Sequence, residues 1–237
     1  MGQISPLKPG EYYPRMARPF ALEQLEKTGS CPGAEQFSNE LAVMRGQLVS
    51  LMQRLDAICQ VVHPDISTFD SYGHEIRNLL LLACTEVEAS WRGVLGANGI
   101  SGKLNTNDYV KLQAAMRLGE YGVGLPYYPW LKPFYPFKRW RAAVPTGSLP
   151  WYQNYQLVKH DRQFHFDKAT LLSAFQSVCA CAVMMWAQFG FSESFRWRME
   201  FGYFFQVSAA PAWRPSQIYR KPSAEGENYS SVHYPFK

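Results

Sequence analysis

Apolar residues recur every three to four positions through residues 35–62, which is the spacing of one face of an α-helix. The pattern predicts an amphipathic helix of roughly 25 residues. We expect it to end at His63-Pro64, because the residue before a proline avoids the helical region. The apolar stripe consists of Leu41, Met44, Leu48, Leu51, Met52, Leu55 and Ile58.

Two more segments show a helical period. Residues 71–95 place Ile76, Leu79, Leu80, Ala83, Val87 and Val94 on one side, and Asn98-Gly99 supplies a stop signal. Residues 106–119 predict a shorter helix that begins with Thr106 or Asn107 as its cap.

The pattern changes at residues 120–147, where five prolines between 120 and 145 exclude a regular helix and favour short strands and extended segments. Ser148 and Pro150 then form a helix-start signature, which predicts a helix to about Arg162. Asp167 is expected to cap a long apolar helix that ends near Phe189.

The run FRWRMEFGYFFQV after Gly190 alternates apolar and polar residues and predicts a strand buried on one face. The predicted fold is therefore mainly α, a bundle of about four or five helices with a small C-terminal β appendage. We expect four segments, namely an N-terminal arm (1–34), a helical domain (35–190) with the irregular insert at 120–147, a short β segment (191–220) and a mobile tail (221–237).

Composition supports a folded protein, because 47% of the 237 residues are hydrophobic and 18% are charged. The five cysteines lack CxxC spacing, which argues against a disulfide framework or a zinc site and predicts a cytoplasmic protein without a metal or cofactor. No charged residue lies between Lys168 and Glu193. We interpret this stretch as a buried core helix, and not as a membrane span, because polar residues dilute it.

Charge is uneven along the chain. Residues 1–120 hold 11 basic and 13 acidic side chains, whereas residues 121–220 hold 11 basic and 4 acidic ones and 25 of the 36 aromatic residues. A surface rich in both cations and aromatic rings is typical of nucleic-acid binding. The alternative is a region whose rings are core and whose cations lie on solvated rims.

The most informative stretch is WYQNYQLVKHDR, residues 151–162. On one helix it would gather Asn154, Tyr155, Lys159, His160 and Arg162 within little more than two turns. His160 between cations is suited to act as a general base, and Lys159 and Arg162 could neutralise a phosphate. The alternative is an ordinary amphipathic helix with a solvated basic face.

A second polar cluster lies on the helix at 71–95 and contains His74, Glu75, Arg77, Asn78, Glu86 and Glu88. Glu86 interrupts an apolar run, and a carboxylate is costly to bury unless it is paired. We therefore expect Glu86 to meet Lys159 or Arg162. A catalytic role and a purely structural ion pair both remain open for this contact. HExxH, P-loop and GxSxG motifs are absent.

The run LLLLACTEVEASW followed by W-Y-x-x-Y-x-x-V-K-H-D-R and a long apolar helix resembles the helical HEPN superfamily (higher eukaryotes and prokaryotes nucleotide-binding), in particular bacterial proteins with a Trp…Tyr-Asn-x-x-Lys-His-x-Arg signature. The resemblance covers about residues 35–190. It implies a helical domain that dimerises and that, in many members, cleaves RNA without a metal, using an Arg and a His four to six residues apart. Here Asn154 stands where that arginine is expected, and Arg162 follows His160.

We therefore predict a HEPN-like RNA-binding protein. The more specific prediction is a metal-independent ribonuclease of a toxin or antiphage defence system. His160, Arg162, Lys159 and Glu86 would be catalytic, and Asn154, Tyr155 and Arg77 would bind the substrate. RNA, a second copy of the chain and a cognate antitoxin are the expected partners. The alternative hypothesis is a non-enzymatic protein- or nucleic-acid-interaction module whose polar cluster is structural.

Overall fold

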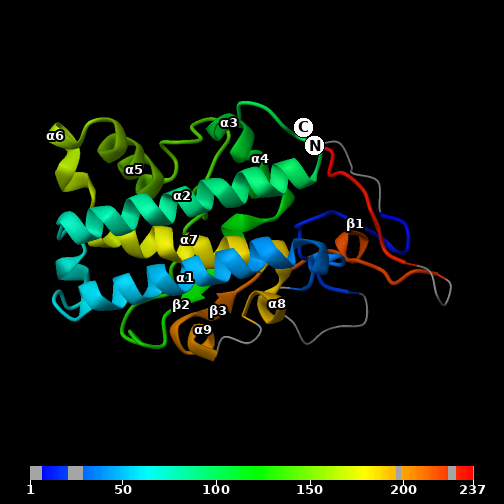
Figure 1. The fold of residues 1–237 in the computed structure, drawn as a ribbon, viewed down its shortest axis with the longest axis horizontal. Coiled ribbons are helices and arrows are strands. Elements are labelled where there is room, and N and C mark those ends of the chain that lie inside the picture. The colour runs from blue at the N-terminus through cyan, green and yellow to red at the C-terminus, as the bar shows by residue number, and fades with distance from the viewer. Residues whose placement is uncertain (1–6, 21–28, 196–198, 224–227, 237) are drawn as a thin grey trace.

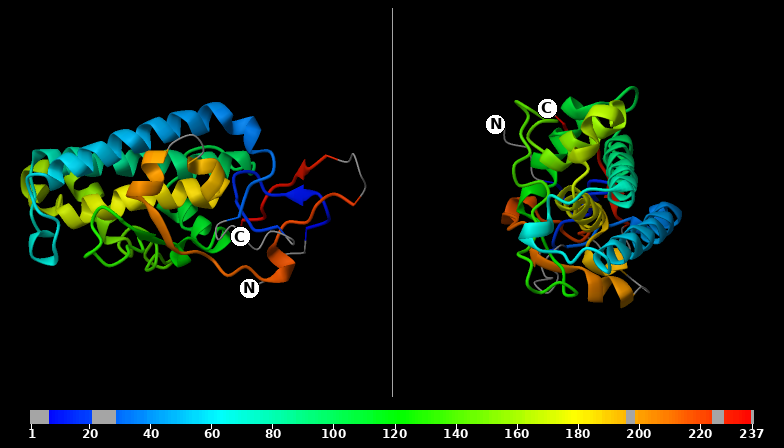
Figure 2. Two further views of the ribbon diagram at one scale, coloured as in Figure 1. Left: turned by 90° about the horizontal axis from the view of Figure 1, so that it is seen from below. Right: turned by 90° about the vertical axis from the view of Figure 1, so that its left-hand side faces the viewer.

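Four long helices form the body of the protein in the computed structural model, which describes residues 7–20, 29–195, 199–223 and 228–236. They are α1 (Ser38–Cys59), α2 (His74–Ala97), α5 (Pro150–His160) and α7 (Leu171–Phe189). Helix α7 runs through the middle and contacts the other three (Figure 1). The end-on view in Figure 2 shows α1 and the insert on opposite sides of α7. The mainly α fold predicted from the sequence is confirmed.

Helices α1 and α2 follow their apolar stripes. The stripe of α1 is buried at Leu48, Leu51 and Leu55, and the opposite face of the helix is exposed. A short 3-10 helix (Ala34–Phe37) precedes α1, so helical structure begins close to the predicted position. Both helices thus obtain their stability from an apolar face turned toward α7.

Helix α7 is apolar on all sides, which suits its position in the core, where other segments of the chain enclose it. Of its most apolar 18-residue window, 89% is buried inside the protein. This confirms the interpretation as a core helix, although α7 is long and apolar enough to cross a membrane. The Thr170 hydroxyl, and not the Asp167 carboxylate, caps it by accepting a hydrogen bond from the Ser173 N–H.

The predicted helix at 106–119 is broken into three short elements. These are α3 (Thr106–Tyr109), α4 (Lys111–Ala115) and a 3-10 helix (Leu118–Glu120), and Asn105 caps the first. Arg117 adopts a left-handed conformation with φ of 54° and forms an ion pair with Glu120. A left-handed residue ends a right-handed helix, which periodicity alone could not indicate.

The insert contains one short strand, β2 (Gly122–Gly124), and otherwise turns and extended segments between residues 125 and 149. β2 pairs in antiparallel fashion with β3 (Gln206–Ala209), and Val123 also bridges to Phe134. The insert is therefore irregular, as predicted. The pairing of β2 with β3 connects it to the C-terminal segment.

The prediction of a strand after Gly190 is wrong for most of the segment. Helices α8 (Phe191–Phe195) and α9 (Met199–Phe204) occupy this segment, residues 196–198 lie outside the described part of the chain, and the strand β3 begins only at Gln206. Packing overrides the alternation, because the adjacent rings of Phe204 and Phe205 are both buried. A strand would point two consecutive side chains to opposite faces.

The N-terminal arm and the C-terminal tail are joined to each other and to the core. Strand β1 (Glu11–Tyr12) pairs in parallel with β4 (Ser230–Ser231), and the Ala17 N–H donates to the Ala187 carbonyl of α7. The tail was expected to be mobile, but residues 228–236 are docked by backbone hydrogen bonds. Residues 224–227 and 237 lie outside the described residues.

Candidate functional site

Helix α5 carries most of the predicted site and ends earlier than expected. Pro150 occupies its first turn, but Ser148 is not its cap, since the Ser148 hydroxyl accepts from the Arg141 N–H. The helix stops at His160 because Asp161 adopts φ −142° and ψ 77°. Arg162 begins a separate helix, α6 (Arg162–His165). Contrary to the prediction from the sequence, Arg162 therefore does not share one helix with Asn154 and His160. The side chain of Arg162 lies outside the described part of the structure.

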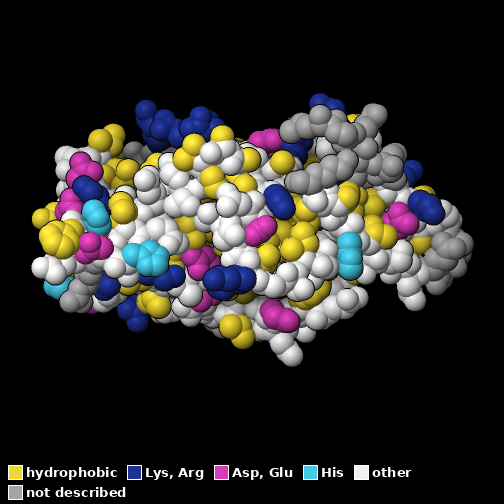
Figure 3. Space-filling view, turned by 90° about the horizontal axis from the view of Figure 1, so that it is seen from above, with side chains coloured by type: hydrophobic (Ala, Val, Ile, Leu, Met, Phe, Trp, Pro, Cys, Tyr) yellow, Lys and Arg dark blue, Asp and Glu magenta, His cyan; other side chains and the backbone are white. Residues whose placement is uncertain are grey.

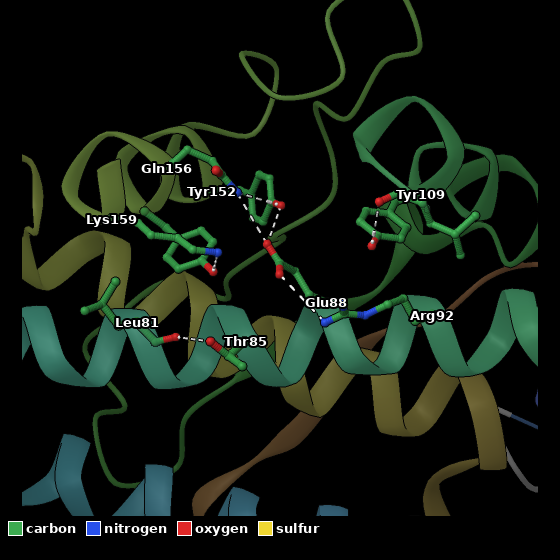
Figure 4. Close-up of polar contacts among 10 residues, drawn as sticks. Leu81, Thr85, Glu88, Arg92, Tyr109, Tyr152, Gln156 and Lys159 are labelled. Atoms are coloured by element: carbon green, nitrogen blue, oxygen red, sulfur yellow. Dashed lines mark hydrogen bonds and ion pairs between the residues drawn. The ribbon is translucent and has the colours of Figure 1, made fainter. Parts of the chain in front are cut away.

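A hydrogen-bonded network joins α5 to α2 (Figure 4). The Tyr152 hydroxyl donates to Glu88 Oε1 at 2.6 Å, and Gln156 Nε2 donates to the Tyr152 oxygen at 2.8 Å. Gln156 Nε2 also lies 3.3 Å from Glu88 Oε1, and Arg92 lies 4.0 Å from the other carboxylate oxygen. Burial and the neighbouring carboxylate raise the pKa of Tyr152, so the phenol stays protonated and continues to donate.

Lys159 and Tyr155 form a second pair beside this network. Lys159 Nζ donates to the Tyr155 hydroxyl at 2.9 Å and lies 5.0 Å from the centre of the ring. This hydrogen bond raises the pKa of Lys159, so the ammonium is fully charged at neutral pH. Burial raises the pKa of Tyr155, which therefore remains neutral.

His160 is exposed at the end of α5 and is oriented by Gln156. Its Nε2 lies 3.2 Å from Gln156 Oε1. An amide oxygen can only accept a hydrogen bond, which assigns the proton to Nε2. In the neutral imidazole Nδ1 is then the atom that can take up a proton. The His160 ring is thus connected through Gln156 to Glu88.

The predicted contact of Glu86 with Lys159 is wrong, and the alternative contact with Arg162 involves a side chain outside the described part of the chain. Glu86 lines a groove on the α1 side of α2, whereas Glu88 faces α5. Successive residues of an α-helix are rotated by about 100°, so two carboxylates two positions apart point in nearly opposite directions. The carboxylate that meets α5 is therefore Glu88. Lys159 donates to Tyr155 instead of to Glu86.

Asn154 and Arg77 do not join His160. The Asn154 amide donates to the Ser173 hydroxyl at 2.9 Å and so links α5 to α7. Arg77 lies eleven residues before Glu88, which is three helical turns on the same face of α2. The Arg77 Nε atom is buried and has no hydrogen-bond partner among the described residues.

Sequence reasoning missed Tyr152, Gln156 and Arg92, and it placed Glu88 in the second polar cluster without giving it a partner on α5. A signal for the first two was present, because Tyr152, Gln156 and His160 are spaced by four and share a face of α5. Glu88 and Arg92 have the same spacing on α2. The site consists of two facing rows of side chains spaced at i and i+4, which meet only when the two helices pack together.

A second feature is the outer surface of the insert, which we call the insert surface. Residues 121–160 contain no Asp or Glu. Figure 3 shows Lys and Arg side chains gathered at its upper left edge, the side on which the insert lies. Four cations of the insert are exposed and form no ion pair with a described residue. They are Lys132, Lys138, Arg139 and Arg141.

Aromatic rings accompany these cations. Tyr127 is 54% exposed and Trp130 is 52% exposed. The Trp130 indole N–H donates to the Pro64 carbonyl at 2.7 Å, and the ring stacks on His63 at 5.0 Å. Trp130 is therefore held rigidly with part of its surface open. Lys138 Nζ lies 5.1 Å from the Tyr135 ring centre.

No protein-family model, curated protein or solved structure matches this chain at a significant level. Within the described part of the chain, no group of three or more His, Cys, Asp or Glu residues is placed to hold a metal ion. The resemblance to the HEPN superfamily stays a prediction.

Proposed function

We propose that this protein binds single-stranded RNA on the insert surface. The observation that carries the proposal is the set of four exposed cations in a segment without any carboxylate between residues 121 and 160. Cations without acidic neighbours attract phosphates, and binding is favoured by release of the counterions of the RNA.

The exposed aromatic rings fit single-stranded RNA better than a duplex. Unpaired bases can stack on aromatic side chains, and each stacked base contributes about 1–3 kcal/mol. Trp130 needs little further ordering to receive a base, because its indole N–H and one ring face are already engaged by Pro64 and His63. Preorganised rings lose less conformational entropy on binding.

The network around Glu88 supports binding over catalysis as the main function. Tyr152, Gln156 and Glu88 satisfy one another, and Lys159 is bonded to Tyr155. A cluster whose polar atoms are satisfied internally is suited to fasten α5 to α2.

Binding to a fluorescent oligouridine, measured by anisotropy between 50 and 200 mM salt, tests the proposal. For the wild-type protein we expect log Kd to rise linearly with log salt concentration. The double variant Lys138→Gln/Arg139→Gln removes two cations and should reduce the salt slope by about 1.4, because each single-strand phosphate contact contributes about 0.7.

The matched control is Lys103→Gln/Lys221→Gln, which removes two exposed cations outside the insert. It should bind RNA nearly as the wild type does, after allowance for the equal change in net charge. Equal weakening by both double variants, or binding that salt does not affect, would overturn the proposal.

A second candidate function is metal-independent RNA cleavage. It is favoured by the exposed His160, whose ring is oriented by Gln156. His160 Nδ1 would take the proton of a ribose 2′-hydroxyl, and the 2′-oxygen would attack phosphorus to give a 2′,3′-cyclic phosphate. The bond from phosphorus to the 5′-oxygen would break, and the 5′-oxygen would take its proton from solvent water. Lys159 would neutralise the phosphate.

Incubation of the wild-type protein with labelled RNA tests this candidate. We expect fragments that end in a cyclic phosphate, and we expect His160→Ala to abolish them while binding and the fold survive. Intact RNA in both reactions, together with salt-dependent binding, would reject cleavage and keep the binding proposal.

We infer a cytoplasmic location, which the five free, buried thiols support because reducing compartments keep cysteines unpaired. Formation of a homodimer is a separate proposal that light scattering of the purified chain would test. The toxin or antiphage context and the cognate antitoxin remain predictions from the family resemblance.

A further inference from the structure

A groove on the opposite side of α2 from the Glu88 network is unexplained by RNA binding. It lies between α1 and α2 and has a volume of about 380 Å³. We call it the α1–α2 groove. Its lining residues are Arg15, Asn39, Glu40, Val43, Met44, Glu86, Ala89 and Ser90. A much smaller cavity shares Met44, Glu86 and Ser90 with the groove, and Gln47 and the α7 residues Cys181 and Met185 also line it.

The Glu86 carboxylate in this groove is not paired with any cation of the described residues. No ion pair or hydrogen bond of its carboxylate is formed with a described residue, and it is half-buried. Burial raises the pKa of Glu86, with no opposing contribution from a nearby positive charge. A carboxylate in this setting stays uncompensated until a cation enters the groove.

Arg15 is a cation in the lining of the groove, and its guanidinium contacts side chains other than Glu86. Arg15 Nε donates to Gln188 Oε1 at 2.8 Å, and one terminal nitrogen contacts Met44 Sδ at 3.7 Å. Its guanidinium also lies 5.5 Å and 5.6 Å from the ring centres of Phe37 and Phe189. Arg15 therefore lines the groove without forming an ion pair with Glu86.

Aliphatic and polar side chains share the remaining walls, since Asn39 and Glu40 line the groove as well. Val43, Met44 and Ala89 offer aliphatic surface, and Val43 is 71% exposed. Ser90 lines the groove together with Glu86, and Gln47 lines the much smaller cavity that adjoins it. A primary ammonium has three N–H donors, which the two carboxylate oxygens of Glu86 and the Ser90 hydroxyl can accept.

We propose that the α1–α2 groove binds an aliphatic primary ammonium, with its charge at Glu86 and its alkyl chain along Val43, Met44 and Ala89. The ligand is a small linear amine, since the volume of about 380 Å³ lies within the range of small-molecule pockets. This site is independent of the insert surface and of His160.

Calorimetric titration of the full-length protein with n-hexylammonium tests the proposal. We expect saturable binding of one equivalent, and much weaker binding of 1-hexanol and hexanoate, which share the chain but lack the positive charge. Glu86→Gln keeps the shape of the side chain and should weaken binding at least about tenfold, the equivalent of 1.4 kcal/mol.

Two further variants make the result specific to the groove. Glu75→Gln removes an exposed carboxylate of the same helix outside the groove and should leave the affinity unchanged. Ala89→Trp should fill the groove and abolish binding while Glu86 remains. Equal binding of hexanol and hexylammonium, no binding of the amine, or undiminished binding to Ala89→Trp would each overturn the proposal.

Discussion

Glu86 and Glu88 show how strongly the environment of one residue depends on helix phase. Both lie in the same apolar run of α2. Glu88 accepts hydrogen bonds from two side chains of α5, whereas Glu86 faces the α1–α2 groove with no cationic partner among the described residues. The first carboxylate holds two helices together, and the second carries a desolvation cost.

Glu86→Gln should therefore stabilise the protein at neutral pH. The pKa of Glu86 is raised in the folded state, so its favourable contribution is complete below the unfolded pKa and is lost as pH rises through the folded pKa. The variant should gain a few tenths of a kcal/mol at pH 7, because the half-exposed carboxylate is partly screened. Urea unfolding should show no gain at pH 3, where the wild-type carboxyl is protonated. A loss of stability at pH 7 would contradict this assignment.

Gly190 is a second residue whose identity is dictated by its surroundings. Its φ is 82°, and an added Cβ would lie 1.9 Å from the Gly29 carbonyl oxygen. Gly190→Ala should therefore destabilise the fold by about 3 kcal/mol or more, through backbone strain and the clash. The control is Gly46→Ala in α1, where nothing lies within 4 Å and the higher helix propensity of alanine should add about 0.5–1 kcal/mol.

At the scale of elements, the seam between α2 and α5 depends on a few polar contacts. Tyr152 and Glu88 are the central pair, with an oxygen–oxygen distance of 2.6 Å. Beneath them, Tyr152 packs edge-on against the buried Trp91 of α2. The polar pair therefore sets the register of two helices that apolar packing already brings together.

A double-mutant cycle with Tyr152→Phe and Glu88→Gln should measure this contact. Each single variant is expected to lose about 1.5–3 kcal/mol, typical of a hydrogen bond to a charged group. The double variant should lose less than the sum, with a coupling energy of at least about 0.5 kcal/mol from urea unfolding. Strict additivity would mean that the two side chains act independently.

Elements that are specified by a pattern within their own residues were predicted accurately, and elements that depend on distant contacts were not. Helices α1 and α2 are close to prediction because one stripe of apolar residues specifies each. The helix expected at 106–119 failed at Arg117, whose left-handed backbone is held by contacts to Glu120 and to the Ala212 carbonyl far along the chain. The segment at 195–207 failed because its alternation covers too few residues to outweigh packing.

At the scale of the whole molecule, Asn98 connects three distant parts of the chain. Its amide nitrogen donates to the carbonyls of Pro14 in the arm and Val94 in α2, and its Oδ1 accepts from the Tyr234 N–H in the tail. Asn98 is almost fully buried. The arm and tail are thus fastened to the end of α2 by one side chain.

Asn98→Ala should loosen both chain ends together. We expect a loss of about 2–4 kcal/mol, since the Pro14 carbonyl and the Tyr234 N–H lose a buried partner, whereas the Val94 carbonyl still accepts from the Asn98 backbone N–H. Limited proteolysis should cut the segment after residue 228 faster than in the wild type. The exposed Asn107→Ala serves as the control and should leave the rate of cleavage unchanged. Equal rates for both variants would show that the tail is held by other contacts.

The amino-acid sequence by itself determined the long helices, the buried apolar α7 and the acid-free basic insert, because these depend on local periodicity and composition. Only the tertiary structure decided that Glu88 and not Glu86 meets α5, and that β1 pairs with β4 across more than two hundred residues. The rotational phase of a helix and the partner of a short strand are set by packing energies between distant segments, which no local pattern contains.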